Sequence, residues 1–290
     1  MDHYLACPFS LPSYHQLRIS YEAETRSLWY FLDPKPRPAF NEEVLKEIRD
    51  FQSRVADHLW AQPEGNEVHY LVLASDVPGV FNLGGDLSLF EKLIKVRDRS
   101  RLMSYARLCV DAVYHNATHL GAPELTTISL VQGMALGGGL EAALSSHVLI
   151  AERDARMGFP EIRFNLFPGM GAYSLLTRRL NLPQVEQLLH SGELKSAEAL
   201  HEMGLVNVVV KRDEGVPAVR EFIRGHMPRR KGHNALRRVC ELMNPLSYSE
   251  LLDITEIWVD AAMRVTRRDL RTMAKLAEAQ NRMIRPRQNI

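Results

Sequence analysis

Cysteines and long apolar runs are both scarce in this sequence. Its three cysteines, Cys7, Cys109 and Cys240, stand far apart in a chain of 290 residues and form no C-x-x-C pair. This scarcity excludes a fold built on disulfides and favours a reducing environment. No apolar run approaches the roughly 20 residues that a membrane-spanning helix needs, and the first residues lack the basic and apolar regions of a signal peptide. We therefore expect a cytoplasmic protein without membrane insertion.

The sequence also has no large excess of positive or negative charge. The chain has 36 basic and 35 acidic residues, which leaves a formal net charge of +1. A nucleic-acid-binding surface needs concentrated positive charge, so we expect no nucleic acid as a partner. Two local basic clusters, residues 224–238 and 264–271, are interpreted as solvated helix faces.

Recognisable cofactor and metal motifs are missing as well. No segment matches G-x-x-x-x-G-K-[ST], the loop that cradles nucleotide phosphates. His115 and His119 have the spacing of two metal ligands on a helix. However, no Glu follows the first His, and no Cys or His cluster supplies further ligands. We interpret the pair as a solvated helix end and predict neither a metal nor another cofactor.

The first half of the chain, by contrast, contains apolar strands that alternate with helices. Hydrophobic residues make up 46% of the sequence, enough for a large core. Apolar patterning predicts a β-hairpin and three buried strands, over residues 17–21 with 28–32, then 68–74, 126–131 and 148–151. Helical spacing predicts a helix from Asn41 and either one long helix or two over 86–119. This alternation is typical of βαβ units and a largely parallel sheet.

Beyond Gly171 the pattern is mostly helical. Short helices are predicted, followed by one strand and a long helical region, over residues 172–180, 183–191, 196–203, 205–210 and from 216 onward. A capping-box pattern at residues 247–250 marks a helix start within that region. We therefore divide the chain into an α/β core, residues 1–210, and a C-terminal helical region, residues 211–290.

The chemistry is concentrated between Val131 and Gly171. An apolar strand enters the glycine triplet 137–139, and an apolar helix over residues 140–146 follows it. This order places bare N–H groups at a helix N-terminus, where negative charge is favoured. Glu141 lies just past the triplet, and Glu161 follows a Gly-Phe-Pro turn. Two glutamates near such a turn make a candidate acid–base site.

Two glycine-rich turns, each after a strand and before a helix, resemble those of the crotonase (enoyl-CoA hydratase/isomerase) superfamily. The matching motifs are Phe-Asn-Leu-Gly-Gly-Asp (81–86), Val-Gln-Gly-Met-Ala-Leu-Gly-Gly-Gly-Leu-Glu (131–141), and Gly-Phe-Pro-Glu (158–161) with Phe-Pro-Gly-Met-Gly (167–171). Their order and spacing match from about residue 15 to residue 290. The resemblance implies an α/β, crotonase-like spiral of ββα units with a C-terminal helical extension.

Within the superfamily, the sequence resembles most the diffusible signal factor synthases of bacterial quorum sensing. The likeness rests on Phe-Asn-Leu-Gly-Gly-Asp-Leu-Ser-Leu-Phe (81–90), Leu-Phe-Pro-Gly-Met-Gly-Ala-Tyr-Ser (166–174), and Thr-Glu-Ile-Trp-Val-Asp (255–260) with Leu-Arg-Thr-Met (270–273). It implies dehydration of a 3-hydroxyacyl–acyl carrier protein to a cis-2-enoyl thioester. Hydrolysis of that thioester would then release a free cis-2-unsaturated fatty acid.

The resemblance also implies roles for individual residues. The N–H groups of Gly85 and Gly138 would form an oxyanion hole for the thioester oxygen. Glu141 and Glu161 would share the acid and base roles, and the sequence does not assign which is which. Candidate acyl-pocket residues are Met170, Trp258 and Leu276. The C-terminal helical region would cover the acyl pocket and form a homotrimer or a dimer of trimers, with a signalling sensor as a possible regulatory partner.

Two other functions remain open on sequence grounds. The first is an ordinary enoyl-CoA hydratase that uses the same two glutamates on coenzyme A thioesters. The second is a crotonase-like regulatory scaffold with little turnover. The sequence does not fix the acyl chain length or the preferred carrier.

Overall fold

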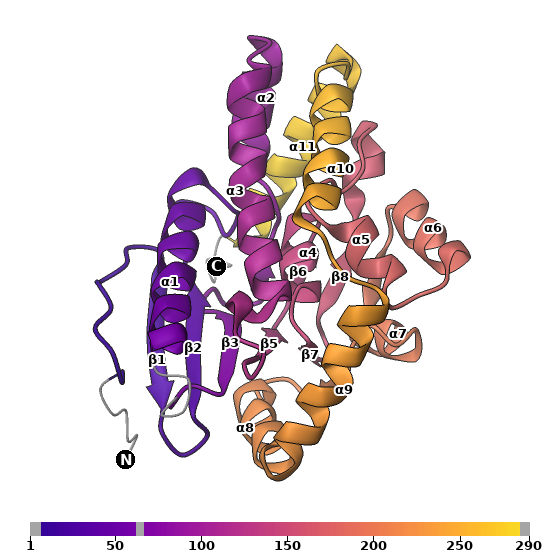
Figure 1. Cartoon of the computed structure of the whole chain (residues 1–290). Coiled ribbons are helices and arrows are strands. Elements are labelled where there is room, and N and C mark those ends of the chain that lie inside the picture. Colours follow the sequence, from indigo (N-terminus) through magenta and orange to yellow (C-terminus); the bar gives the residue numbers. More distant parts are fainter. Residues whose placement is uncertain (1–6, 62–66, 285–290) are drawn as a thin grey trace, which may run out of the picture.

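The computed structural model describes residues 7–61 and 67–284. The predicted α/β fold is confirmed, and its elements are drawn in Figure 1. Residues 1–6, on which the expectation of no signal peptide rests, lie outside the described residues, as do residues 285–290 of the expected helical region. Within the described part, no helix has the length and apolar character needed to cross a membrane.

A six-stranded sheet forms the centre of the fold. Its order is β1-β2-β3-β5-β7-β10, with bounds Leu17–Glu22, Ser27–Leu32, Tyr70–Ser75, Thr126–Val131, Val148–Glu152 and Val208–Val210. The first two strands pair antiparallel as the predicted hairpin, and the other pairs are parallel. The predicted hairpin and parallel sheet are therefore confirmed. The expected strand over residues 205–210 is shorter, because only its last three residues pair with β7.

A second, smaller sheet was not predicted. Its order is β4-β6-β8-β9, with bounds Val80–Asn82, Met134–Leu136, Arg156–Gly158 and Leu194–Ser196. Three residues are too few to show a strand period in the sequence. The first three of these strands follow β3, β5 and β7 directly, so the chain makes the same step from the large sheet to the small one three times. Each step is followed by helical structure, which gives a spiral of ββα units.

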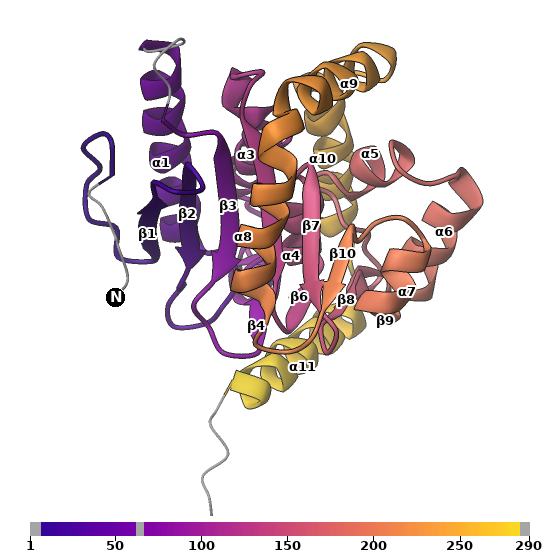
Figure 2. The ribbon, with the colours of Figure 1, turned by 90° about the horizontal axis from the view of Figure 1, so that it is seen from below.

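Helices cover both faces of the large sheet. On one face lie α1 (Glu42–Ala61) and α3 (Arg99–Ala117), within the main hydrophobic core. On the other face lies α8 (Gly215–His226), which Figure 2 shows from below. Its Val219 and Ile223 pack against strand residues. Because α8 belongs to these packed layers, the division of the chain at residue 210 stays a prediction.

The expected helical segment over residues 86–119 consists of two helices rather than one. Asp86 caps α2 (Leu87–Lys95), and Asp98 caps α3. Between them Arg97 has a positive φ of 55°, which breaks the helical path. The two caps accept hydrogen bonds from N–H groups in the first turn of their helices, those of Ser88 and Arg101.

Most of the remaining helices belong to the C-terminal half of the chain. They are α4 (Gly138–Leu144), α5 (Ala172–Thr177), α6 (Leu182–Ser191), α7 (Ala197–Glu202), α9 (Arg230–Met243), α10 (Tyr248–Ala262) and α11 (Arg267–Ile284), with 3₁₀ turns η1 (His119–Gly121), η2 (Pro160–Phe164) and η3 (Met227–Arg229). Helix α10 packs on α3, and α11 packs on α2 and η2. The last two helices therefore lie beside the segments that carry the predicted site.

The interpretation of His119 as part of a solvated helix end is wrong. The helix ends at Ala117, and His119 itself adopts a left-handed φ of 45°. Its side chain is buried, stacks on His147 with ring centroids 5.6 Å apart, and lies 3.4 Å from Glu241. Because the helix has already ended, His115 and His119 do not share a face, and His115 stays exposed.

The basic cluster at residues 224–238 is also not uniformly solvated. The side chains of Arg230 and Arg237 are only 14% and 13% exposed. Arg230 pairs with Glu124 at 3.1 Å and Arg237 with Glu241 at 3.5 Å. Glu241 lies on α9 itself, so the contacts that hold α9 against the rest of the molecule are the ion pair between Arg230 and Glu124 and the hydrogen bond from Arg237 Nη1 to Thr126 Oγ1 (3.3 Å).

The junction between the two sheets depends on glycine at Gly133. This residue has a φ of +87°, and an added Cβ would lie 1.9 Å from Gly79 O. The same turn carries the hydrogen bond from Met134 N to Gly79 O (3.0 Å). A side chain at Gly133 would therefore separate β4 from β6.

We expect Gly133→Ala to lower the free energy of unfolding by about 3 kcal/mol, because it adds both backbone strain and a clash with the backbone. The matched control is Gly225→Ala in α8, where no atom lies within 4 Å of the added Cβ. That exposed helical change should raise stability by about 0.5–1 kcal/mol. Urea unfolding followed by circular dichroism measures both, and similar values for the two variants would contradict the prediction.

Candidate active site

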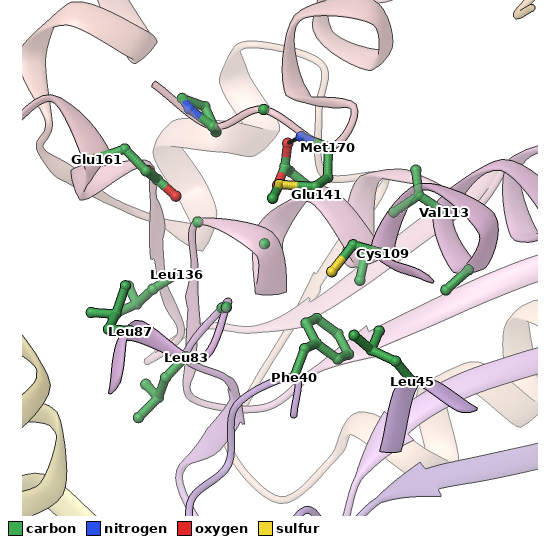
Figure 3. A pocket seen from close by; sticks show the side chains of 18 of the residues that line it. Phe40, Leu45, Leu83, Leu87, Cys109, Val113, Leu136, Glu141, Glu161 and Met170 are labelled. Carbon is green, nitrogen blue, oxygen red and sulfur yellow. Dashed lines mark hydrogen bonds between the residues drawn. The ribbon is translucent and has the colours of Figure 1, made fainter. Parts of the chain in front are cut away.

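A cavity of about 200 Å³ lies inside the molecule beside α4. Its walls come from α1, α3 and α4, from strands of both sheets, and from η2, and residues of α10 and α11 complete them. Figure 3 shows part of this mostly apolar lining. Gly138, Glu141, Ala142 and Ser145 all line the cavity, so one face of α4 runs along its length.

The two glycine turns meet at the head of this cavity. Gly84 has a φ of +91°, and an added Cβ would lie 2.7 Å from Leu136 O and 3.2 Å from Gly138 N. An added Cβ at Gly138 would lie 3.5 Å from Gly85 N. The backbones of the two turns are therefore in direct contact, and the N–H groups of Gly85 and Gly138 lie close together.

These two N–H groups differ from those of the preceding glycines. Gly84 N donates to Asn82 Oδ1 (2.7 Å), and Gly137 N donates to Gly158 O (2.9 Å). Within residues 7–61 and 67–284, no such bond engages Gly85 N or Gly138 N. Gly138 is also the first residue of α4, so its N–H lies at the positive end of a helix. Two adjacent free donors are the arrangement that an oxyanion hole requires.

Tyr105 anchors the first glycine turn, residues 84–86, through hydrogen bonds, a role that the sequence did not reveal. Its hydroxyl donates to Phe40 O and accepts a hydrogen bond from Asp86 N (3.2 Å). Phe40 N in turn donates to Gly84 O (2.8 Å). The residues on both sides of Gly85 are thus bonded to the rest of the fold, which holds its N–H in one orientation.

Glu141 lies almost completely inside the protein, 1% exposed, on the first turn of α4. Its Oε1 accepts hydrogen bonds from Met170 N and Ala172 N, both at 2.9 Å. Burial raises its pKa to about 7, and the backbone N–H groups of residues 170–172 oppose this rise. The N–H donors therefore favour the ionised form of this carboxyl.

Glu161 approaches the cavity from η2, as Figure 3 shows. Its Oε1 would lie 2.1 Å from an added Cβ at Gly137, so the carboxyl packs directly on the second glycine turn. Its Oε2 has no hydrogen-bond partner in the described structure. Burial, followed by the negative charge of Glu141, raises the pKa of Glu161 to about 8. Of the two carboxyls, this one retains its proton more readily.

The two glutamates thus flank the peptide between Gly137 and Gly138. An added Cβ at Gly138 would lie 3.7 Å from Glu141 Oε2, and one at Gly137 would contact Glu161. Two carboxyls with unequal pKa values in a mostly apolar cavity can act as base and acid near neutral pH. The structure therefore brings Glu141, Glu161, Gly85 and Gly138 together at one point.

The three predicted acyl-pocket residues all line the same cavity. Met170 lies in the loop whose N–H groups bind Glu141, Trp258 lies on α10, and Leu276 lies on α11. The loop and α10 are locked together, because Thr255 Oγ1 donates to Gly169 O (2.8 Å) and an added Cβ at Gly169 would lie 2.3 Å from Trp258 Cγ. Their apolar side chains could hold a hydrocarbon chain.

Several further lining residues were missed by the sequence analysis. They are Gln52 on α1, Cys109 and Asn116 on α3, and Ser145 at the end of α4. Gln52 and Asn116 occupy positions within apolar helical faces, at 2% exposure each, and a polar residue on such a face was the signal available. Among the described residues, no group of three or more His, Cys, Asp or Glu side chains could hold a metal ion.

Comparison with known sequences gives a match over most of the chain. The profile of the enoyl-CoA hydratase/isomerase family matches residues 30–251. Crotonyl-CoA hydratase of Syntrophomonas wolfei is 29% identical over 201 residues, covering 69% of this chain and 71% of that protein. Mitochondrial methylglutaconyl-CoA hydratase of Rattus norvegicus is 30% identical over 181 residues, 62% of this chain. That match spans 54%, about half, of the rat protein's length.

Solved structures share the fold. Enoyl-CoA hydratase of Bacillus halodurans superposes with a TM-score of 0.71 at 18% identity, covering 90% of this chain and 99% of that chain. Pseudomonas aeruginosa DspI superposes with a TM-score of 0.61 at 22% identity, covering 96% and 98%. At these identities the likeness establishes the fold alone. The family profile, which spans well over half of the sequence, goes further, and this chain belongs to the enoyl-CoA hydratase/isomerase family.

Proposed function

We propose that this protein adds water to, or eliminates water from, the C2–C3 bond of an acyl-coenzyme A thioester. The observation that carries the proposal is the pair of carboxyls, Glu141 and Glu161, on either side of the Gly137–Gly138 peptide in an apolar cavity. Relatives named as hydratases of coenzyme A thioesters support this reaction class and this carrier.

The oxyanion hole is proposed to lie between Gly85 N and Gly138 N. Proton transfer at C2 places negative charge on the thioester oxygen, and two fixed N–H donors stabilise that charge as it develops. Because each donor belongs to the backbone of a packed turn, it needs no reorganisation during the reaction. The acyl chain would then extend along α4, past Met170, Trp258 and Leu276.

The two glutamates receive separate roles from their surroundings. Glu141 has the lower pKa and two N–H donors, so it acts as the ionised base. Glu161 keeps its proton and lies against Gly137, next to the proposed oxyanion hole and therefore beside C2. In hydration, Glu141 takes a proton from the water that attacks C3, and Glu161 delivers its proton to C2. Dehydration follows the same path in reverse.

A second candidate is the diffusible signal factor reaction on an acyl carrier protein thioester, with release of a free cis-2-unsaturated acid. One observation favours it. The segments that carried this resemblance, residues 166–174 and 255–260, contact each other through Thr255, Gly169 and Trp258 beside the cavity. A water molecule polarised by Glu141 would attack the thioester carbonyl in the hydrolytic step. A signalling sensor as a partner belongs to this candidate only.

We also propose a homotrimer or a dimer of trimers, as the resemblance implies. Helix α9 presents apolar side chains to solvent at exposures from 53% to 82%, namely Leu236, Val239, Leu242 and Met243. Such a stripe on one surface helix is typical of an interface. It supports assembly through the C-terminal region.

Glu141→Gln and Glu161→Gln should each lower kcat for hydration of a 2-enoyl-CoA by about 10²–10⁴-fold, because each removes one proton-transfer group. The control is Glu202→Gln on the exposed surface of α7, which should keep wild-type rates.

Mass spectrometry of the reaction products distinguishes the candidate functions, when both coenzyme A and acyl carrier protein thioesters are supplied as substrates. Free acid would favour the second candidate, and no turnover on either carrier would favour a binding scaffold.

The pH dependence of kcat/KM should be bell-shaped. The rate should rise as Glu141 ionises near pH 7 and fall as Glu161 loses its proton above about pH 8. Below both values no base is present, and above both no acid is present. Initial rates across this range measure the profile, and a rate that keeps rising above the pKa of Glu161 would contradict its role as the acid.

Removal of one oxyanion donor should affect kcat strongly. Gly138 is the first residue of α4, a position that tolerates proline, so Gly138→Pro costs the helix little. It removes the N–H and also places the ring Cδ along the former N–H direction, where the thioester oxygen would bind. We expect a loss of about 10²–10³-fold in kcat. Gly138→Ala keeps the N–H and meets only ordinary contacts, the nearest at 3.5 Å, so its loss should be much smaller. Thermal unfolding checks both folds, and equal losses would argue against this donor.

A further inference from the structure

The far end of the cavity carries polar groups that the proposed chemistry does not use. Tyr30, Gln52, Asn116 and Ser145 all line the cavity, and none is more than 4% exposed. A chain built only of methylene groups gains nothing from polar walls, and a buried polar group without a partner costs free energy. The far end of the cavity is therefore suited to bind a polar group of the ligand instead of a hydrocarbon segment.

These polar groups lie well beyond the reacting carbons. Ser145 follows Gly138 by seven residues along α4, which is about 10 Å at the helical rise. Asn116 Nδ2 donates to Ser145 Oγ at 2.8 Å, and Tyr30 Oη reaches Asn116 Oδ1 at 3.5 Å. An acyl chain whose thioester oxygen sits at Gly138 N would bring its distal carbons to this cluster.

Gln52 leaves one acceptor unsatisfied there. Its Nε2 donates to Ala112 O at 3.0 Å, whereas its Oε1 is buried without a partner. The orientation of the amide is fixed, because a backbone carbonyl can only accept. Ala112 and Asn116 are one turn apart on α3, so the free oxygen lies near the rest of the cluster.

The hydrogen bonds of the cluster define what it can accept. The contact between Tyr30 Oη and Asn116 Oδ1 is at the outer limit of a hydrogen bond, so the tyrosine hydroxyl can donate to a better-placed acceptor. The charged residues among the lining, Glu141, Glu161 and Arg163, belong to α4 and η2, and none belongs to α1, α3 or β2. A charged group would stay uncompensated at this end, whereas a neutral hydroxyl could donate to Gln52 and accept from Tyr30.

We propose that the acyl chain bound in this cavity carries a hydroxyl group at or next to its distal end. The inference rests on the proposed function, which places the thioester at Gly85 and Gly138. It adds a substrate class: hydroxylated acyl chains whose terminal O–H is recognised by Gln52 Oε1.

The test is a binding comparison by isothermal titration calorimetry on the whole chain. The ligands are saturated acyl-pantetheine amides of increasing length, each with and without a terminal hydroxyl. The amide replaces the thioester, so neither hydration nor hydrolysis consumes them. At the best-fitting length, the hydroxylated ligand should bind wild type about tenfold more tightly, the effect of one buried hydrogen bond. Gln52→Leu should reverse this preference to about tenfold in favour of the plain chain.

The control is Ile48→Leu, one turn earlier on α1 and also lining the cavity. It changes shape without changing polarity, so it should shift both affinities alike and keep their ratio. A ratio measured on one protein does not depend on how much of it is folded. Equal binding of both ligands to wild type, or an unchanged ratio in Gln52→Leu, would overturn this inference alone. Binding of neither ligand at any length would overturn the proposed function together with it.

Discussion

The close approach of the two glycine turns is the constraint on which the site depends. Gly84 and Gly138 touch through their backbones, and Gly137 leaves just enough room for the carboxyl of Glu161. Once these turns are in contact, the direction of α4 is set, and Glu141 falls on its first turn inside the protein. The positions of both carboxyls and both free N–H groups therefore follow from the packing of two short segments of backbone.

This arrangement has a cost in stability. The folded state raises the pKa of Glu141 and Glu161 from an ordinary 4.5 to about 7 and about 8. The folded protein therefore holds these protons more tightly than the unfolded chain does. That contribution to stability is complete below pH 4.5 and is lost as the pH rises toward 8. At neutral pH the fold therefore opposes ionisation of both groups.

The sequence predicted those features that depend on local pattern. The hairpin, the buried strands and the position of α4 follow from apolar periodicity and glycine placement. The caps at Asp86 and Asp98, which begin two separate helices in the segment 86–119, were not predicted. The small sheet was missed because its strands have three residues each. His119 was misread because its burial depends on Glu241, 122 residues away. The unpaired oxygen of Gln52 likewise depends on which helix packs beside α1, which no local pattern contains.

The two ends of the cavity rely on different kinds of contact. At the head, the thioester oxygen would be bound by backbone N–H groups, which any sequence that preserves the turns can supply. At the far end, the lining consists of side chains from β2, α1, α3 and the end of α4, and substitutions there change shape and polarity without moving Gly85 or Gly138. Relatives are named for different acyl groups, crotonyl and methylglutaconyl, at about 30% identity to this chain. A thioester site built from backbone, combined with a far end built from exchangeable side chains, lets one fold bind several acyl chains. In this chain, Gln52 sets the polarity at the far end of the cavity.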